Sequence, residues 1–162
     1  MIFKSIEFGS DDFRKECELR DRVLRAPLGL SLFDEDLECE VAQQHFGLFD
    51  DAQNLVACAI AILLSPTQAR IRQMAVRVAD QKQGFGRQIL RGIEDRLSAS
   101  GHVQVYLHAR MSARRFYEKL EYATTGEEFI EVGISHIRME KFLLNPQSCV
   151  KTPDTKYGRN PS

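Results

Sequence analysis

The chain has 162 residues, of which 43% are hydrophobic and 28% are charged, values that are ordinary for a soluble globular protein. Its formal net charge of −1 gives no basic footprint for a polyanion, so nucleic acid is not expected as a partner. No apolar run reaches the length of a membrane span and no signal-peptide pattern is present, so neither membrane insertion nor secretion is expected. The four cysteines lack metal-binding spacing, so we expect reduced thiols, no metal and a cytoplasmic location.

A single domain is expected over residues 1–143, and the polar, proline-containing residues 144–162 are expected to form a mobile tail. The spacing of apolar residues and the turn signals predict strands over 1–8, 45–49, 55–64, 69–78, 103–109, 122–128 and 136–143. They predict helices over 11–24, within 30–42, from the glycine turn to about residue 100, and over 112–119. Ser10 or Asp11 is the expected cap of the first helix. Strands outnumber helices, and one strand-helix-strand unit lies in the middle. This order predicts an α/β (α+β) fold with a mixed, largely antiparallel twisted sheet and helices on both faces.

Residues 74–87 are the most informative stretch of the chain. They join the end of an apolar, strand-like run to a helical pattern through a turn that contains Gly84 and Gly86. The start of a helix after a glycine turn is a natural anion site, because its backbone N–H groups point outward and its dipole is positive there. The pattern therefore predicts a ligand that carries phosphate.

Three phosphate-binding loops compete for this pattern. A Walker loop requires Lys after its last glycine, whereas Arg87 follows Gly86. A dinucleotide fingerprint requires a third glycine where Ile89 stands. What remains, Gln81-x-x-Gly84-x-Gly86, resembles the acyl-CoA pyrophosphate loop of the GCN5-related N-acetyltransferases (GNAT), whose pattern is Arg/Gln-x-x-Gly-x-Gly/Ala. An ordinary strand-to-helix turn is the alternative for so short a pattern.

A second motif lies downstream and resembles the second signature of the same family. Residues 113–122 read Ala-Arg-Arg-Phe-Tyr-Glu-Lys-Leu-Glu-Tyr, and the family pattern is Ala-x-x-Phe-Tyr-x-Lys-x-Gly-Phe/Tyr. Two departures are present, since Arg110 stands where the family often has Asn and Glu121 stands where it has Gly. Residues 20–29 and 131–139 resemble stretches of an uncharacterised bacterial-type subgroup. The resemblance covers the whole predicted domain and implies a GNAT fold.

The resemblance implies acetyl-CoA as co-substrate and transfer of its acetyl group to a primary amine by direct attack. The end of the strand would offer backbone groups to the pantetheine arm or polarise the thioester carbonyl, and the glycine turn would hold the pyrophosphate. The cofactor-binding residues implied in this way are Met74, Ala75, Val76, Gln81, Lys82, Gln83, Gly84, Phe85, Gly86, Arg87 and Arg110. The expected acceptor is a small-molecule amine or, alternatively, a peptide or protein amine, and a homodimer is an open alternative to a monomer. A non-catalytic acyl-CoA sensor on the same fold is the rival function, because fold does not decide function.

Transfer requires a neutral amine, a base that takes its proton and an acid near the departing thiolate. Tyr117 occupies the position of the acid in the family. His136 is the expected base, because an imidazole accepts protons near neutral pH, and Glu131, Glu40 and His45 are weaker candidates. For each of these side chains a purely structural role is the alternative.

Three further residues are candidates to line the cleft. His108 ends the strand that precedes the helix of Tyr117. Arg22 and Arg25 are candidates to bind a substrate carboxylate, and pairing with Asp34 or Glu38 of the acidic segment, residues 30–42, is the alternative.

Overall fold

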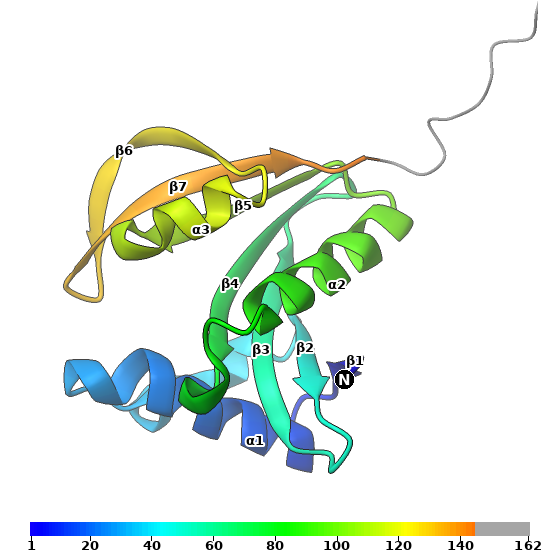
Figure 1. The fold of residues 1–162 in the computed structure, drawn as a ribbon, viewed down its shortest axis with the longest axis vertical. Helices are drawn as coiled ribbons and strands as arrows, with labels where there is room; N and C mark the ends of the chain where they lie inside the picture. The colour runs from blue at the N-terminus through cyan, green and yellow to red at the C-terminus, as the bar shows by residue number, and fades with distance from the viewer. Residues whose placement is uncertain (145–162) are drawn as a thin grey trace, which may run out of the picture.

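The computed structural model describes residues 1–144 (Figure 1). The mobile tail expected over 144–162 falls, from residue 145 onward, outside the described residues. The strands and helices are β1 (Ile2–Ile6), α1 (Asp11–Arg20), β2 (Gln44–Phe49), β3 (Leu55–Leu63), β4 (Gln68–Val76), α2 (Phe85–Ala99), β5 (Gln104–Arg110), α3 (Arg114–Glu118), β6 (Ala123–Glu131) and β7 (Ile134–Phe142). None of the helices in residues 1–144 is long and apolar enough to cross a membrane.

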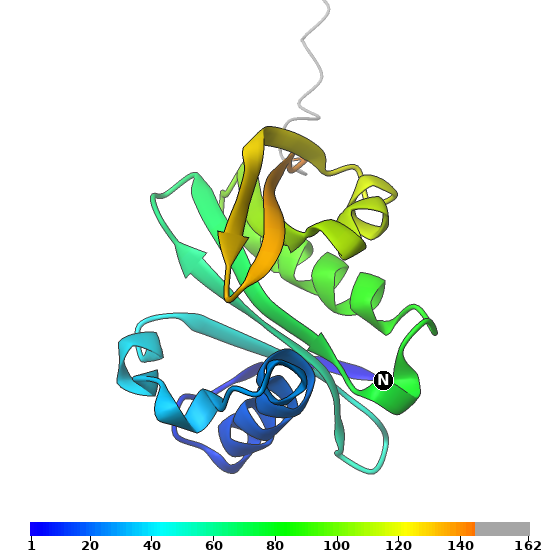
Figure 2. The same ribbon diagram turned by 90° about the vertical axis from the view of Figure 1, so that its left-hand side faces the viewer.

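The strands of residues 1–144 form one seven-stranded sheet in the order β1-β2-β3-β4-β5-β7-β6. Only β4 and β5 run parallel, and α2 connects them; all other neighbours pair antiparallel. The helices α2 and α3 cover one face of the sheet, and α1 covers part of the other (Figures 1 and 2). The predicted fold, a mixed and largely antiparallel sheet with helices on both faces, is therefore confirmed.

The strand β3 is buried on both of its faces and separates two hydrophobic cores. Ala57, Ala59 and Ala61 join the core under α2, whereas Cys58 joins the core under α1. Successive residues of a strand point to opposite faces, so an uninterrupted apolar run such as β3 requires cover on both sides. The apolar stripe of α2, with Ile89, Leu90, Ile93 and Leu97, supplies that cover on the first face.

The N-terminal third differs from the sequence prediction at two helices. Ser10 caps α1 as expected, because its hydroxyl accepts a hydrogen bond from the N–H of Phe13 at 3.1 Å. The α-helix ends at Arg20 and continues as a π-helical turn, Asp21–Arg25, in place of the predicted helix to residue 24. The acidic segment forms two 3₁₀ helices, Leu32–Asp34 and Leu37–Glu40, instead of one short helix.

The parallel pair β4 and β5 is joined only at its beginning. Residues 68–70 pair with residues 104–106, and beyond this point the two strands separate (Figure 2). The other half of the sheet, from β5 to β6, therefore leans away from β1–β4. The last hairpin also extends further than predicted, because β6 continues to Glu131 and turns at Val132 and Gly133, both at positive φ.

A β-bulge in β4 explains the separation. Cys58 pairs with Ala75 and Ile60 pairs with Arg72, so β4 contains one more residue than β3 between these two pairs. The extra residue, Gln73, has a φ of 54°, which is uncommon outside glycine. A bulge bends its own strand, and here it turns the second half of β4 away from β5.

The close packing of β2 against its neighbours gives a stability prediction. A Cβ atom at Gly47 would lie 2.6 Å from a ring carbon of Phe49 and 2.8 Å from a methyl of Leu55. We expect Gly47→Ala to lower the free energy of unfolding by about 1–3 kcal/mol through overpacking, measured by urea denaturation. Gln88→Ala, an exposed position on α2, is the control and is expected to change it by less than about 0.5 kcal/mol. Equal midpoints for the two variants would contradict the packing described.

Candidate active site

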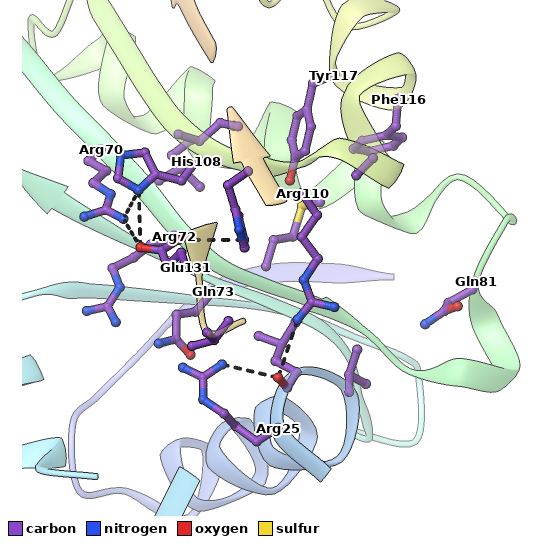
Figure 3. Close-up of a pocket in the computed structure, with 18 residues that line it drawn as sticks. Arg25, Arg70, Arg72, Gln73, Gln81, His108, Arg110, Phe116, Tyr117 and Glu131 are labelled. Atoms are coloured by element: carbon purple, nitrogen blue, oxygen red, sulfur yellow. Dashed lines mark hydrogen bonds and ion pairs between the residues drawn. The ribbon is translucent and has the colours of Figure 1, made fainter. Parts of the chain in front are cut away.

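A cavity of about 430 Å³ opens where β4 and β5 separate (Figure 3). Its walls come from β4, β5, the π-helical turn after α1, the start of α3 and the β6–β7 hairpin. Five of the expected catalytic and cofactor-binding residues line it together: Met74, Gln81, Arg110, Tyr117 and His136. The fold thus brings both expected catalytic side chains and part of the expected donor site into one space.

The other expected cofactor residues lie beside the cavity and not in its lining; they are Ala75, Val76, Lys82, Gln83, Gly84, Phe85, Gly86 and Arg87. Residues 81–84 form an exposed turn, and α2 begins at Phe85. Gln81 closes this turn, because its side-chain Nε2 donates to the carbonyl of Val76 at 3.1 Å. Gly84 has a φ of 89°, a conformation that glycine adopts without strain. Arg87 borders a second cavity, of about 270 Å³, between α2 and the end of α3.

The backbone at the end of β4 is open on the side of β5. The N–H of Arg77 donates to the carbonyl of Val56 on β3 at 2.8 Å. Successive residues of a strand direct their N–H and C=O groups to opposite sides, so Val76 and Met74 direct theirs toward the gap. Ala75 pairs with β3. Of the two amides expected to polarise a thioester carbonyl, that of Val76 faces the gap and that of Ala75 does not.

Tyr117 is 9% exposed, and its hydroxyl is held in the protonated form. Burial raises the pKa of Tyr117 to about 12, although the positive charge of Arg110 opposes this. The rings of Phe116 and Tyr122 pack edge-on against it, at centroid distances of 5.0 and 5.8 Å. A fixed phenol with this pKa is a proton donor at neutral pH.

The orientation of His136 fixes which ring nitrogen is basic. Its Nδ1 lies 2.8 Å from the carbonyl oxygen of Ile134. A carbonyl only accepts hydrogen bonds, so Nδ1 carries the proton and Nε2 is the unprotonated nitrogen of the neutral ring. That Nε2 lies 3.7 Å from the carboxylate of Glu131. The ring is buried, and Phe129 stacks on it at a centroid distance of 6.0 Å.

His108 lines the cavity as expected, next to Arg70. Arg70 Nη2 donates to His108 Nδ1 at 2.9 Å, and Glu131 Oε1 lies 3.4 Å from the same nitrogen. Burial and the charge of Arg70 lower the pKa of His108, against the opposing effect of Glu131. His108 is therefore neutral at physiological pH. Within residues 1–144 no three His, Cys, Asp or Glu side chains gather in a way that could hold a metal ion.

Two weaker candidates for the base, Glu40 and His45, do not line the cavity. They belong to a buried ion-pair cluster that also contains Glu16 and Arg20. Arg20 binds the carboxylate of Glu40 through two nitrogens, at 2.9 and 2.6 Å, and His45 Nδ1 lies 2.9 Å from Glu16. Both weaker candidates are therefore held in this cluster, away from the cavity where the base is expected to act.

The cluster also reaches the cavity wall. Arg20 Nε donates to the side-chain oxygen of Gln73 at 3.0 Å, and Gln73 is the bulge residue of β4 and lines the cavity. The sequence contained one signal for this arrangement, which is the spacing of Glu16 and Arg20 four residues apart on α1.

Arg25 lines the cavity, whereas Arg22 does not. Arg25 Nε donates to a carboxylate oxygen of Glu35 at 2.5 Å. The alternative expected for Arg25 was a pair with Asp34 or Glu38. That partner is wrong, because Arg25 pairs with Glu35 of the same acidic segment.

A known protein family matches most of this chain. Residues 31–143 match the family model described as an acetyltransferase (GNAT) domain. The chain belongs to the GNAT acetyltransferase family. It is 30% identical over 133 residues to the uncharacterized protein YyaT of Bacillus subtilis, a match that covers 80% of this chain and 88% of YyaT. The family that the two motifs indicated is confirmed.

Two solved structures show the same fold at low sequence identity. An aminoglycoside 6′-N-acetyltransferase complexed with coenzyme A has a TM-score of 0.74 and 16% identity, with 89% of this chain and 98% of that chain covered. A chimera of the spermidine N-acetyltransferase SpeG from Vibrio cholerae and hSSAT has a TM-score of 0.68 and 18% identity, with 88% and 97% covered.

The buried His45 couples the stability of the GNAT domain to pH. Both ring nitrogens face acceptors, Glu16 at 2.9 Å and the carbonyl of Glu40 at 3.1 Å, so both carry protons. Burial opposes the charged form, but the hydrogen bond and charge of Glu16 outweigh it and raise the pKa of His45. A raised pKa stabilises the fold below the unfolded pKa of about 6.5, and this contribution is lost as the pH rises through the folded value.

We therefore expect the free energy of unfolding to decline from about pH 6.5 upward. Urea denaturation of the wild type and of His45→Gln over this range measures it. The variant should be less stable near pH 6 and should show a smaller decline. An equal slope in both proteins would show that His45 does not carry the effect.

Proposed function

We propose that the chain transfers an acetyl group from acetyl-CoA to a primary amine by direct attack. The observation that supports this most strongly is the single cavity between β4 and β5 that contains both Tyr117 and His136, with the turn of Gln81 at its edge. Family membership supports an acyltransferase, and the coenzyme A bound to the aminoglycoside acetyltransferase of similar fold supports an acyl-CoA donor.

The chain offers free backbone groups where the donor would bind. The N–H and C=O groups of Met74 and the N–H of Val76 face the gap, where they would pair with the amides of the pantetheine arm. The helix α2 begins after Gly84 without a side-chain cap, so its first N–H groups are free for the pyrophosphate. Lys82 and Arg87 would add charge-assisted contacts around the turn, and Arg110 would line the path of the arm.

The proposed catalytic steps use Nε2 of His136 and the hydroxyl of Tyr117. The nitrogen of the amine attacks the thioester carbon, and His136 Nε2 takes the proton that this nitrogen loses. The N–H of Val76 stabilises the negative charge that develops on the carbonyl oxygen. The carbon–sulfur bond then breaks, and Tyr117 gives its proton to the departing sulfur. The products are an N-acetylated amine and CoA.

The acceptor in this proposal is a small-molecule amine, with a peptide or protein amine as the alternative. The proteins of similar fold are acetyltransferases of spermidine and of aminoglycosides, which supports an amine as acceptor. The cytoplasmic location and the homodimer alternative stay predictions.

Removing the hydroxyl of Tyr117 tests the proposed acid. We expect Tyr117→Phe to lower kcat about 100-fold or more, with the affinity for acetyl-CoA unchanged, because protonation of the thiolate is lost while the ring remains. CoA release from acetyl-CoA over a panel of amines measures kcat. Tyr106→Phe, outside the cavity lining, is the control. Tight acetyl-CoA binding by the wild type with no turnover on any amine would favour the non-catalytic sensor.

Gly84 tests the proposed pyrophosphate site. Gly84 and Gly101 flank the two ends of α2, have φ values of 89° and 93°, and have no neighbouring atom within 4 Å of an added Cβ. A β-branched side chain cannot hold this conformation, so both Gly84→Val and Gly101→Val should lose some stability. Only Gly84→Val should weaken acetyl-CoA binding, by about tenfold in calorimetry. Equal affinities in the two folded variants would remove the glycine turn from the donor site.

A further inference from the structure

The cavity has a second end, away from the glycine turn, that the donor site does not use. Gln81 and Phe116 lie at one end, and Arg70, His108 and Glu131 lie at the other (Figure 3). Arg70 and Arg72 alternate along β4, so both side chains project from the same face of the sheet, opposite α2. This arginine end is the part of the cavity that the acceptor is free to occupy.

Cationic side chains outnumber carboxylates in the lining of this cavity. The charged lining residues are the arginines Arg25, Arg70, Arg72 and Arg110 and the single glutamate Glu131. Glu35 meets the charge of Arg25 from outside the lining. The excess of positive charge that remains indicates a negatively charged ligand.

Arg70 has hydrogen-bonding capacity that the protein leaves unused. Its Nη2 bonds to the neutral His108 at 2.9 Å, and the nearest carboxylate oxygen, on Glu131, is 3.8 Å away. Its Nε is buried and has no hydrogen-bond partner among residues 1–144. A buried donor without a partner is costly, so the contacts within the protein leave Arg70 incompletely satisfied.

Arg72 lacks a carboxylate of its own within residues 1–144. The nearest is Glu40, at 4.0 Å, and both nitrogens of Arg20 already bind that carboxylate. Arg72 instead donates to the neutral side chain of Gln43 at 3.3 Å. Burial lowers the pKa of Arg72, and repulsion from Arg20 and Arg70 adds to this against the attraction of Glu40. An anion between these guanidinium groups would relieve the repulsion.

We propose that the arginine end binds an anionic group of the acceptor, so that the acceptor is an amine that also carries a carboxylate or phosphate. Arg70 and Arg72 would hold the anion by charge-assisted hydrogen bonds, and the amine would then point toward His136 and the thioester. This inference rests on the proposed function. It distinguishes the chain from the spermidine acetyltransferase of similar fold, whose named substrate is a polyamine.

The experiment compares amines of one chain length and different charge with the full chain. They are δ-aminovalerate, pentylamine and cadaverine, which end in a carboxylate, a methyl group and a second amine. Phosphoethanolamine and ethanolamine form a separate pair that tests phosphate. We expect kcat/KM for δ-aminovalerate to exceed that for pentylamine, or kcat/KM for phosphoethanolamine to exceed that for ethanolamine, by about tenfold or more, because only the first amine of each pair carries an anionic group. Whichever anion gives the larger ratio is the group that the site selects.

Variants then assign the preference to the arginine end. Arg70→Gln and Arg72→Gln should raise the KM for the preferred anionic amine by about tenfold to a hundredfold. The KM for acetyl-CoA should stay unchanged, and kcat/KM should fall much less for pentylamine than for the anionic amine. Arg14→Gln, which removes an exposed arginine of α1, is the matched control and should leave all these values unchanged.

Three results would overturn the inference. Equal kcat/KM for all amines, or a preference for cadaverine, would remove the anion site and leave acetyl transfer intact. A weaker acetyl-CoA affinity in Arg70→Gln would assign the arginine end to the donor. If the wild type acetylates no amine, calorimetry with valerate in the presence of CoA tests the anion site directly. Valerate binding that Arg70→Gln abolishes would support the anion site although the proposed transfer activity has failed. Absence of valerate binding would overturn the anion site.

Discussion

The buried ion pair between Arg20 and Glu40 supports the geometry on which the whole site depends. Arg20 also holds the side chain of Gln73, which is the extra residue of the bulge in β4. A non-glycine residue at positive φ persists only when its surroundings hold it in place. The bulge separates β4 from β5, and the separation both opens the cavity and leaves backbone groups of Met74 and Val76 without partners in the sheet. The buried cluster around Arg20 thus supports the bulge beside which the cavity opens.

The same fold prepares the two proposed catalytic groups in different ways. Burial keeps the phenol of Tyr117 protonated, with its pKa raised to about 12. The carbonyl of Ile134 fixes the tautomer of His136 so that Nε2 is the basic nitrogen. One group is controlled by the loss of hydration and the other by a hydrogen bond on the far side of its ring. Neither effect depends on a bound metal or on a strongly coupled pair of carboxylates.

Local patterns in the sequence predicted much of the fold and one half of the site. The apolar run of β3, the apolar stripe of α2 and the glycine turn before α2 each depend on residues close together in the sequence. Hydrophobic periodicity and turn residues were therefore sufficient to predict these three features. The bulge at Gln73 was not predictable, because no glycine or proline marks it and the hydrogen bond that holds its side chain comes from Arg20, 53 residues away. The positions of Glu40 and His45 were hidden for the same reason, since only the tertiary fold places them in the buried cluster.

The basic character of the cavity was also hidden in the sequence, because the net charge of the chain is close to zero. The acidic segment supplies Glu35 to Arg25 and Glu40 to Arg20. Within residues 1–144 this leaves Arg72 with Glu40 only at 4.0 Å, and Arg70 with Glu131 only at 3.8 Å. The two arginines occupy alternate, half-exposed positions of a strand whose other face is buried under α2. Substitutions at such positions alter the charge of the cavity with little effect on the core. In the proposed function, the glycine turn therefore holds the donor while the outward-facing residues of β4 set the charge of the acceptor.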